Sequence, residues 1–146
     1  MDKIKLSFPS KENYKWVINN NTVVCIMNCF VNLYVSEHNY ENKIKQKFPK
    51  VKFNYDGFWF NVAGVAKLNP NDEYDEVLGK HLAEARAKEK AYSVANRVAC
   101  LYHELMCADL AAVEDFTEDT CYQYEHEGNH INYLITGKDY LTTRKD

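Results

Sequence analysis

The spacing of the apolar residues changes at Pro70, and this change constrains the fold more than any other feature of the sequence. Before Pro70, apolar residues recur at every second position in several short segments, as in half-buried β-strands. After Pro70 they recur about every 3.6 residues, and the stretch from Asp72 to Val113 contains no proline and a single glycine, Gly79. The sequence therefore predicts an α+β fold, in which an N-terminal antiparallel β-sheet packs against one long or two consecutive C-terminal helices.

Turn-forming residues divide the N-terminal half into strands. The asparagine run 19–21 favours a turn before the longest apolar alternation, and Asp56–Gly57 is a strong hairpin signal. A lysine-rich stretch at 43–50 is expected to connect the two halves of the sheet. The aromatic cluster at 58–60 suits the sheet core, and a base-stacking platform like that of single-strand binders is the alternative. The expected strands are 4–8, 14–18, 23–35, 51–55 and 58–65.

The predicted helical region is long for a chain of this size. Its N-cap would be Asn69, Asn71 or Asp72, beside Pro70. Helix from 75 to 113 would extend about 58 Å, which exceeds the width of such a domain, so we expect a break near 93–96 or pairing with a second copy. We expect a single domain, 1–146, with four parts: mainly β at 1–68, helix at 72–113, an acidic loop with a short final strand at 114–137, and a polar tail at 138–146.

The charges are strongly segregated along the chain. Residues 1–97 carry 15 basic and 11 acidic side chains, whereas residues 98–137 carry eight carboxylates and no Lys or Arg. This acidic segment predicts a surface that binds a basic partner, although a solvated edge that keeps the protein soluble explains the same pattern. Within it, Tyr122 and Tyr124 could act as aromatic anchors. The candidate partner-binding residues are Glu104, Asp109, Glu114, Asp115, Glu118, Asp119, Tyr122, Tyr124, Glu125 and Glu127.

No motif of a known catalytic site is present in the sequence. It has no glycine-rich phosphate loop, HExxH motif, nucleophile elbow or EF-hand loop, and its five glycines leave little material for a nucleotide-cradling turn. The closest candidates are histidines beside carboxylates, at 103–104 and 125–127, but neighbours in sequence do not define a catalytic geometry. We therefore expect a protein that is not an enzyme, without catalytic residues or a cofactor.

The five cysteines form no CxxC pair, and their odd number suits a reducing compartment. Cys100, His103 and Cys107 would lie roughly on one helical face, and further residues able to bind zinc follow: Cys121, His126 and His130. Burial of Cys100 and Cys107 in the core explains their spacing without a metal, so no metal site is expected. The sequence also shows neither a membrane-spanning stretch nor a signal peptide, which favours the cytoplasm.

The segment from Gly64 to Tyr92 resembles known proteins. A strand ending in Gly64-Val-Ala-Lys-Leu-Asn-Pro70 runs into the acidic turn Asn-Asp-Glu-Tyr-Asp-Glu76 and then into Gly79-Lys-His-Leu-Ala-Glu-Ala-Arg86-Ala. This arrangement resembles a segment of small accessory proteins of phages and prophages of Gram-positive bacteria. The resemblance implies a phage or mobile-element accessory protein, a class rich in inhibitors of bacterial immunity such as anti-CRISPR proteins.

These features lead to a first functional hypothesis and two alternatives. The first is a phage-encoded counter-defence protein of the anti-CRISPR class, located in the cytoplasm of an infected or lysogenic bacterial host. It would bind a host defence protein, a Cas effector nuclease, stoichiometrically, and its acidic segment would block the nucleic-acid channel without contacting nucleic acid or membrane.

The first alternative is a sponge for a cyclic nucleotide immune signal, which requires a homodimer or a larger oligomer. Its pocket would use basic and aromatic residues between subunits: Arg86, Lys88, Lys90, Tyr92 and Arg97. The second alternative is a phage DNA-binding accessory factor that uses the lysines from Lys43 to Lys52.

Overall fold

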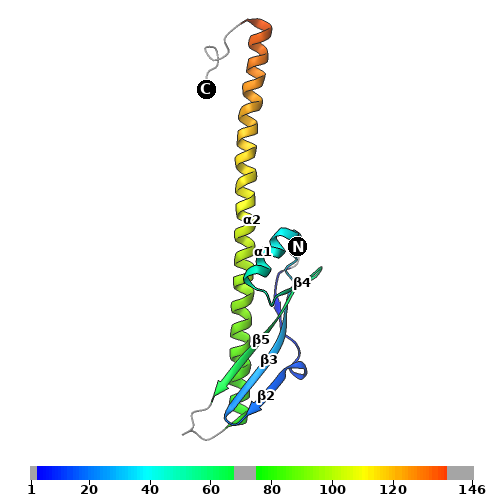
Figure 1. The fold of residues 1–146 in the computed structure, drawn as a ribbon, viewed down its shortest axis with the longest axis vertical. Coiled ribbons are helices and arrows are strands. Elements are labelled where there is room, and N and C mark those ends of the chain that lie inside the picture. The colour runs from blue at the N-terminus through cyan, green and yellow to red at the C-terminus, as the bar shows by residue number, and fades with distance from the viewer. Residues whose placement is uncertain (1–2, 68–74, 138–146) are drawn as a thin grey trace. The chain divides into compact units, whose positions relative to one another are not determined.

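The computed structural model describes residues 3–67 and 75–137 of the 146-residue chain (Figure 1). The chain divides into two compact units, Met1–His103 and Glu104–Asp146, here called the first and the second unit, where the sequence predicted a single domain. The fold is α+β, as predicted, with a five-stranded antiparallel sheet followed by one long helix. The predicted turn at Pro70 and the predicted polar tail at 138–146 lie outside the described residues.

The sheet belongs to the first unit and is built on two long central strands. β3 (Thr22–Val31) pairs along its whole length with β5 (Gly57–Lys67). β1 (Leu6–Ser7) and β2 (Lys15–Asn19) pair with different parts of β3, and β4 (Lys52–Asn54) pairs with the start of β5. A short 3₁₀ helix, Lys11–Asn13, precedes β2. The strand order β1–β3–β5–β4 confirms the predicted antiparallel sheet, because all pairs are antiparallel.

Two tight turns join the hairpins of the sheet. Asn20, between β2 and β3, has a φ of 54°, a conformation that asparagine adopts more readily than most residues. Between β4 and β5, the side-chain Oδ1 of Asn54 accepts hydrogen bonds of 2.9 Å from the backbone N–H groups of Asp56 and Gly57. Both turns confirm the predictions made from their asparagine and glycine residues.

The predicted lysine-rich connection at 43–50 is wrong in part, because a helix occupies most of it. α1 spans His38–Lys47 and buries two side chains one turn apart, Tyr40 and Ile44. A salt bridge of 3.0 Å joins Glu41 to Lys45 at the i, i+4 spacing that stabilises helices. Lys43, Lys45 and Lys47 therefore belong to the exposed side of an amphipathic helix, and Lys50 lies beyond its end.

α2 is one continuous helix from Glu76 to Thr136, so the predicted break near 93–96 is wrong. Its N-terminus is capped by Asp75, whose Oδ1 accepts a hydrogen bond of 3.2 Å from the backbone N–H of Leu78. The N-cap was expected a few residues earlier. The helix continues past residue 96 because no proline removes a hydrogen bond from its backbone ladder.

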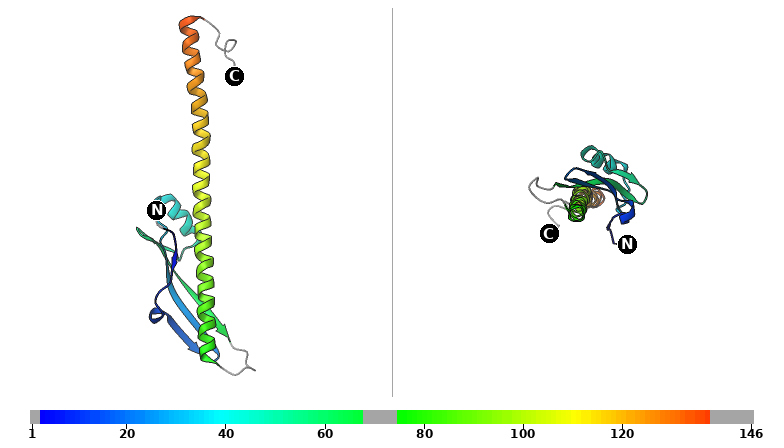
Figure 2. Two further views of the ribbon diagram at one scale, coloured as in Figure 1. Left: turned by 180° about the vertical axis from the view of Figure 1, so that it is seen from behind. Right: turned by 90° about the horizontal axis from the view of Figure 1, so that it is seen from below.

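The part of α2 in the first unit lies against one face of the sheet and touches it backbone to backbone (Figures 1 and 2). Small residues spaced four apart on this part of α2 are buried: Gly79, Ala83, Ala87 and Ala91. Opposite them lies Gly64 of β5, where a Cβ atom would be 2.0 Å from the carbonyl oxygen of Ala83 and 2.3 Å from the backbone nitrogen of Ala87. The helix therefore lies closer to the sheet than any side chain at position 64 would allow.

This packing determines which side chains form the core. The buried face of β3 carries Val23, Cys25, Met27, Cys29 and Val31, and the buried face of β5 carries Phe58, Phe60, Val62 and Ala66. The alternate residues of both strands point to the other face of the sheet. No described helix buries these residues.

The second unit corrects the prediction for residues 114–137. α2 continues to Thr136, where an acidic loop and a short final strand were expected. Asp, Thr and Asn each cost a helix less than about 1 kcal/mol relative to alanine, so a run of them does not end it. The threonine hydroxyls also donate hydrogen bonds to carbonyl oxygens one turn earlier, as at Thr117 and Thr136. Gly137, with a φ of 73°, ends the helix in the manner of a glycine C-cap.

Gly64→Ala is expected to lower the free energy of unfolding by about 1–3 kcal/mol or more, because its Cβ would overlap backbone atoms of α2 that cannot rotate away. The matched control is Gly128→Ala, in the interior of the same helix, where no described atom lies within 4 Å of the added Cβ. That substitution should raise helix stability by up to about 1 kcal/mol. Denaturant unfolding followed by circular dichroism measures both. Equal stability of the Gly64→Ala and wild-type proteins would contradict the close packing.

The cysteines should divide into two reactivity classes. Burial raises the pKa of the Cys25 and Cys29 thiols to about 11, whereas Cys100, Cys107 and Cys121 are exposed. Because the thiolate is the reactive form, a chromogenic disulfide reagent at neutral pH should modify three thiols rapidly in the native protein and all five in denaturant. Rapid modification of all five without denaturant would contradict the burial of Cys25 and Cys29.

Candidate functional site

All ten residues predicted to bind a partner lie on α2 in the second unit, and all are exposed. They belong to 33 residues of helix, from Glu104 to Thr136, rather than to a loop. A helix fixes the direction of each side chain, so the predicted residues can be sorted by the face on which they lie.

Six of the eight carboxylates share one face of this helix. With about 100° of rotation per residue, they fall within an arc of about 140°. Tyr122 lies within this arc, and its ring stacks on that of His126 with centroids 6.2 Å apart. Asp109, Tyr124 and Glu127 lie outside it. The carboxylates of this acidic face are Glu104, Glu114, Asp115, Glu118, Asp119 and Glu125.

The opposite side of the same helix carries an apolar stripe. Neighbouring members of the stripe are three, four, seven or eleven residues apart, which places all of them within an arc of about 60° around the helix axis. Each of them is at least 45% exposed, so no described residue covers the stripe. The stripe consists of Met106, Leu110, Val113, Tyr124, Ile131 and Ile135. Tyr124 thus belongs to the apolar stripe and not to the acidic face.

The acidic face has no Lys or Arg near it in sequence, since none occurs between residues 98 and 137. Histidine is the only other basic side chain in this stretch. Like charges one turn apart on a helix repel each other, and they give its surface a negative potential. The second unit therefore presents an amphipathic helix with one acidic and one apolar side.

The basic residues proposed for a nucleotide sponge make contacts within the first unit. Arg86 Nη1 donates a hydrogen bond of 2.7 Å to the Val65 carbonyl oxygen, and Lys90 Nζ donates one of 2.9 Å to that of Ala63. These contacts satisfy carbonyl groups on the part of β5 that β4 does not reach, because β4 pairs only with the first residues of β5. The two cations therefore cover an open edge of the sheet.

Three further residues proposed for the sponge also contact other side chains of the first unit: Lys88, Tyr92 and Arg97. Lys88 forms a salt bridge of 3.2 Å with Glu84, and the hydrogen bond to Glu84 raises the pKa of Lys88. Burial acts to raise the pKa of the Glu84 carboxyl, but the hydrogen bonds with Lys88 and Tyr14 and the charge of Lys88 together outweigh it, so the pKa is lowered. The Tyr92 ring packs edge-on against Phe8 at 5.5 Å, and Arg97 lies over Phe48. The described residues therefore give these side chains structural roles.

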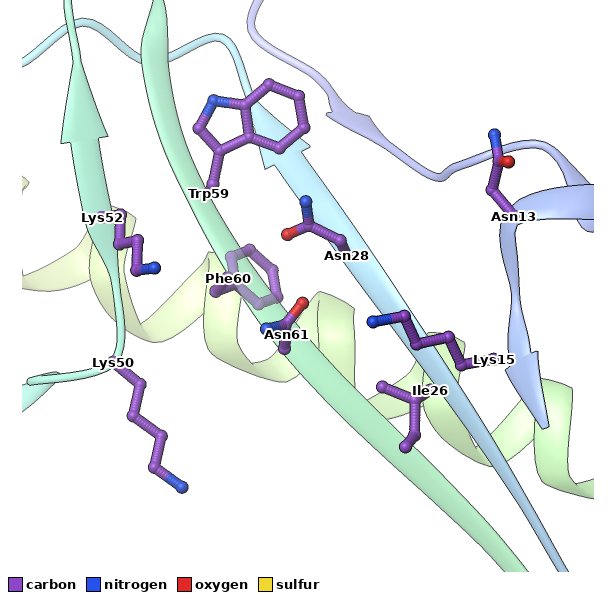
Figure 3. A pocket seen from close by; sticks show the side chains of 9 residues that line it. All are labelled: Asn13, Lys15, Ile26, Asn28, Lys50, Lys52, Trp59, Phe60 and Asn61. Carbon is purple, nitrogen blue, oxygen red and sulfur yellow. The ribbon is translucent and has the colours of Figure 1, made fainter. Parts of the chain in front are cut away.

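A hollow of about 470 Å³ on the uncovered face of the sheet contains residues that were not predicted as a site (Figure 3). Two of its lysines, Lys50 and Lys52, come from the lysine-rich stretch of the DNA-binding alternative, and Lys15 of β2 adds a third. The other lining residues include three asparagines and Trp59. The alternation of the strands could have identified this group, because all residues of one parity share a face.

The possible zinc ligands are not assembled. Among the described residues, no group of three or more His, Cys, Asp and Glu side chains could hold a metal ion. The expectation that Cys100 and Cys107 face the core is also wrong, since both are exposed. The reason is that the buried stripe of α2 follows Ala83, Ala87 and Ala91, which leaves these cysteines on other faces. Cys100 Sγ lies 3.6 Å from Asn96 Oδ1 instead.

Comparisons with protein-family models, curated proteins and solved structures found no match to this chain. No helix in the described part of the chain has the length and apolar character needed to span a membrane.

Replacement of both Arg86 and Lys90 by Ala should lower the free energy of unfolding by about 0.5–1.5 kcal/mol for each lost hydrogen bond, because the edge carbonyls lose their donors. Glu89→Ala is the control, since Glu89 is exposed on the same stretch of α2 and makes no hydrogen bond to the sheet edge within the described residues. Urea unfolding of the three proteins measures the differences. An unchanged midpoint in the double variant would contradict the edge-covering role.

Proposed function

We propose that this chain is a non-catalytic binding protein whose acidic helix occupies a basic, nucleic-acid-binding surface of a partner protein. The observation that carries this proposal is the arrangement of six carboxylates along one face of a helix without any Lys or Arg between residues 98 and 137. A nucleic-acid channel is lined by Lys and Arg side chains that bind regularly spaced phosphates. Carboxylates spaced along a helix can bind the same Lys and Arg side chains.

The apolar stripe gives the same helix a second means of attachment. An amphipathic helix binds by laying its apolar side chains, here spaced from Met106 to Ile135, in a groove of the partner. The carboxylates then lie at the rim of the interface, where they mainly increase the rate of association and the specificity. A groove with apolar walls and a basic rim therefore suits this helix.

A basic partner suits the acidic helix better than a second copy of the chain. Paired helices that present charges beside their seam are stabilised when opposite charges face each other. Asp109 and Glu127 flank the apolar stripe, and residues 98–137 supply no Lys or Arg to face them. Self-pairing through the stripe would bring these like charges together, whereas a basic groove would attract them.

The resemblance of Gly64–Tyr92 to phage accessory proteins supports a more specific form of the proposal. In this form the protein is a counter-defence inhibitor of the anti-CRISPR class, the partner is a Cas effector nuclease, and binding is stoichiometric. Inhibition would follow because the acidic helix and the nucleic acid compete for the same basic channel.

The test measures inhibition of purified Cas effector nucleases in DNA and RNA cleavage assays. Cleavage by the target nuclease should be abolished at a ratio near one to one, and inhibition should weaken as salt is raised. Reversal of Glu114, Asp115, Glu118 and Asp119 to Lys should raise the half-inhibitory concentration at least about tenfold, equivalent to about 1.4 kcal/mol.

The matched control reverses the same number of exposed carboxylates in the first unit: Glu12, Glu37, Asp56 and Glu89. It changes the net charge by the same amount and should inhibit like the wild-type protein. Equal inhibition by the acidic-face variant and the wild type would exclude this face as the binding surface. Lack of inhibition across the nuclease panel would refute the anti-CRISPR form of the proposal.

A further inference from the structure

The uncovered face of the sheet in the first unit forms ordered rows of side chains across neighbouring strands. Because Asn28 pairs with Asn61 in the β3–β5 register, their amides lie side by side. One row further along, Phe30 pairs with Trp59, which in turn pairs with Lys52 of β4. On the other side of the asparagines, Ile26 pairs with Lys15 of β2. The face thus combines aromatic, amide and cationic groups.

The cations of this hollow are available to a ligand. The lining residues include Lys15, Lys50 and Lys52 but no carboxylate. Within the described part of the chain none of these three lysines forms a salt bridge, unlike Lys45, Lys80 and Lys88, which pair with glutamates. Figure 3 shows Lys15 and Lys52 extending from opposite sides toward the strands between them. A hollow with this charge favours an anionic ligand.

Trp59 gives the hollow a flat aromatic surface. Its side chain is 37% exposed although it lies on a central strand. Its ring packs on Phe30 with centroids 4.5 Å apart, so the ring is held in place from below while part of it remains accessible. An accessible aromatic ring on a sheet is the surface on which single-stranded nucleic acids stack their bases.

Asn28 and Asn61 lie between the aromatic row and Lys15 (Figure 3). Both are exposed, and within the described residues neither side-chain amide makes a hydrogen bond. An amide offers a donor and an acceptor together, which matches the polar edge of a base. The volume of about 470 Å³ is that of a small-molecule site.

We propose that this face of the sheet binds nucleotides, with a base stacked on Trp59 and phosphate groups at Lys15 and Lys52. The ligand chemistry is a base joined to phosphate, which a short single strand or a free nucleotide can supply. The site is formed by residues of the first unit, and it does not depend on the function proposed for the acidic helix. A phosphate-only ligand would leave Trp59 unused.

The experiment uses the full-length protein and a fluorescein-labelled ten-nucleotide oligodeoxythymidine, with binding followed by fluorescence anisotropy. The dissociation constant at physiological salt should fall in the range of about 1–100 µM that non-specific binding shows. With Lys15 and Lys52 at the phosphates, the slope of the logarithm of the association constant against the logarithm of the salt concentration should be about −1.4. Unlabelled oligodeoxythymidine, ATP and inorganic pyrophosphate serve as competitors.

Two variants test the two halves of the site. Trp59→Ala should weaken binding by about fivefold to a hundredfold, the effect of losing one stacked base. Lys15→Glu combined with Lys52→Glu should weaken binding at least tenfold and flatten the salt slope. The control is Lys43→Glu with Lys47→Glu, two exposed lysines of α1 that make the same charge change outside the hollow. It should bind like the wild type.

The competitors distinguish the source of the nucleotide. Displacement of the labelled oligonucleotide by micromolar ATP supports a site for free nucleotides. Displacement only by unlabelled oligonucleotide supports a site for single strands. Pyrophosphate that competes as well as ATP would overturn the proposal, because the base would then play no part. Absence of binding at 100 µM protein, or equal losses in the control and hollow variants, would also overturn it. Circular dichroism verifies that each variant is folded.

Discussion

The backbone contact between α2 and Gly64 controls which surfaces of the first unit are left for binding. Because position 64 has no side chain, Ala83 and Ala87 can lie directly on β5. A stripe of small residues from Gly79 to Ala91 then packs on one face of the sheet, and larger side chains of α2 lie to either side of it. The helix leaves the other face open. Both the sheet-edge contacts and the open hollow follow from this single placement.

The same placement separates the cations of the first unit into two groups. Arg86 and Lys90 lie beside the contact stripe on α2, so their side chains reach the carbonyl groups at the uncovered edge of β5. Lys15 and Lys52 are on strands and point to the face that α2 does not cover, where no described carboxylate neutralises them. All four residues contribute equally to the net charge, but only Lys15 and Lys52 remain available to a ligand.

Much of the fold followed from residue spacing, and the errors have identifiable physical causes. Alternation predicted the two central strands because their buried faces repeat every second residue, although β3 ends at Val31 and not at Val35 as predicted. It missed α1, where Tyr40 and Ile44 supply only two buried positions, and lysines hide the helical period. The acidic segment reads as a loop from its sequence because Asp, Thr and Asn favour turns, but each of them costs a helix little and no proline intervenes. For the site, the sequence identified the carboxylates, whereas their division into an acidic face and an apolar stripe required knowing that the segment is helical.

The carboxylates of the second unit link the stability of its helix to binding. Helices in proteins draw most of their stability from packing of an apolar face, and the stripe from Met106 to Ile135 is exposed. Repulsion among Glu114, Asp115, Glu118 and Asp119 further opposes the helical state in the free protein. A basic groove would remove both penalties at once, because it covers the stripe and neutralises the charges. Added salt screens the repulsion but also screens attraction to the groove, so it favours the free helix while weakening the complex. A surface that is costly to leave unpartnered in this way is better explained by a basic partner than by solubility alone.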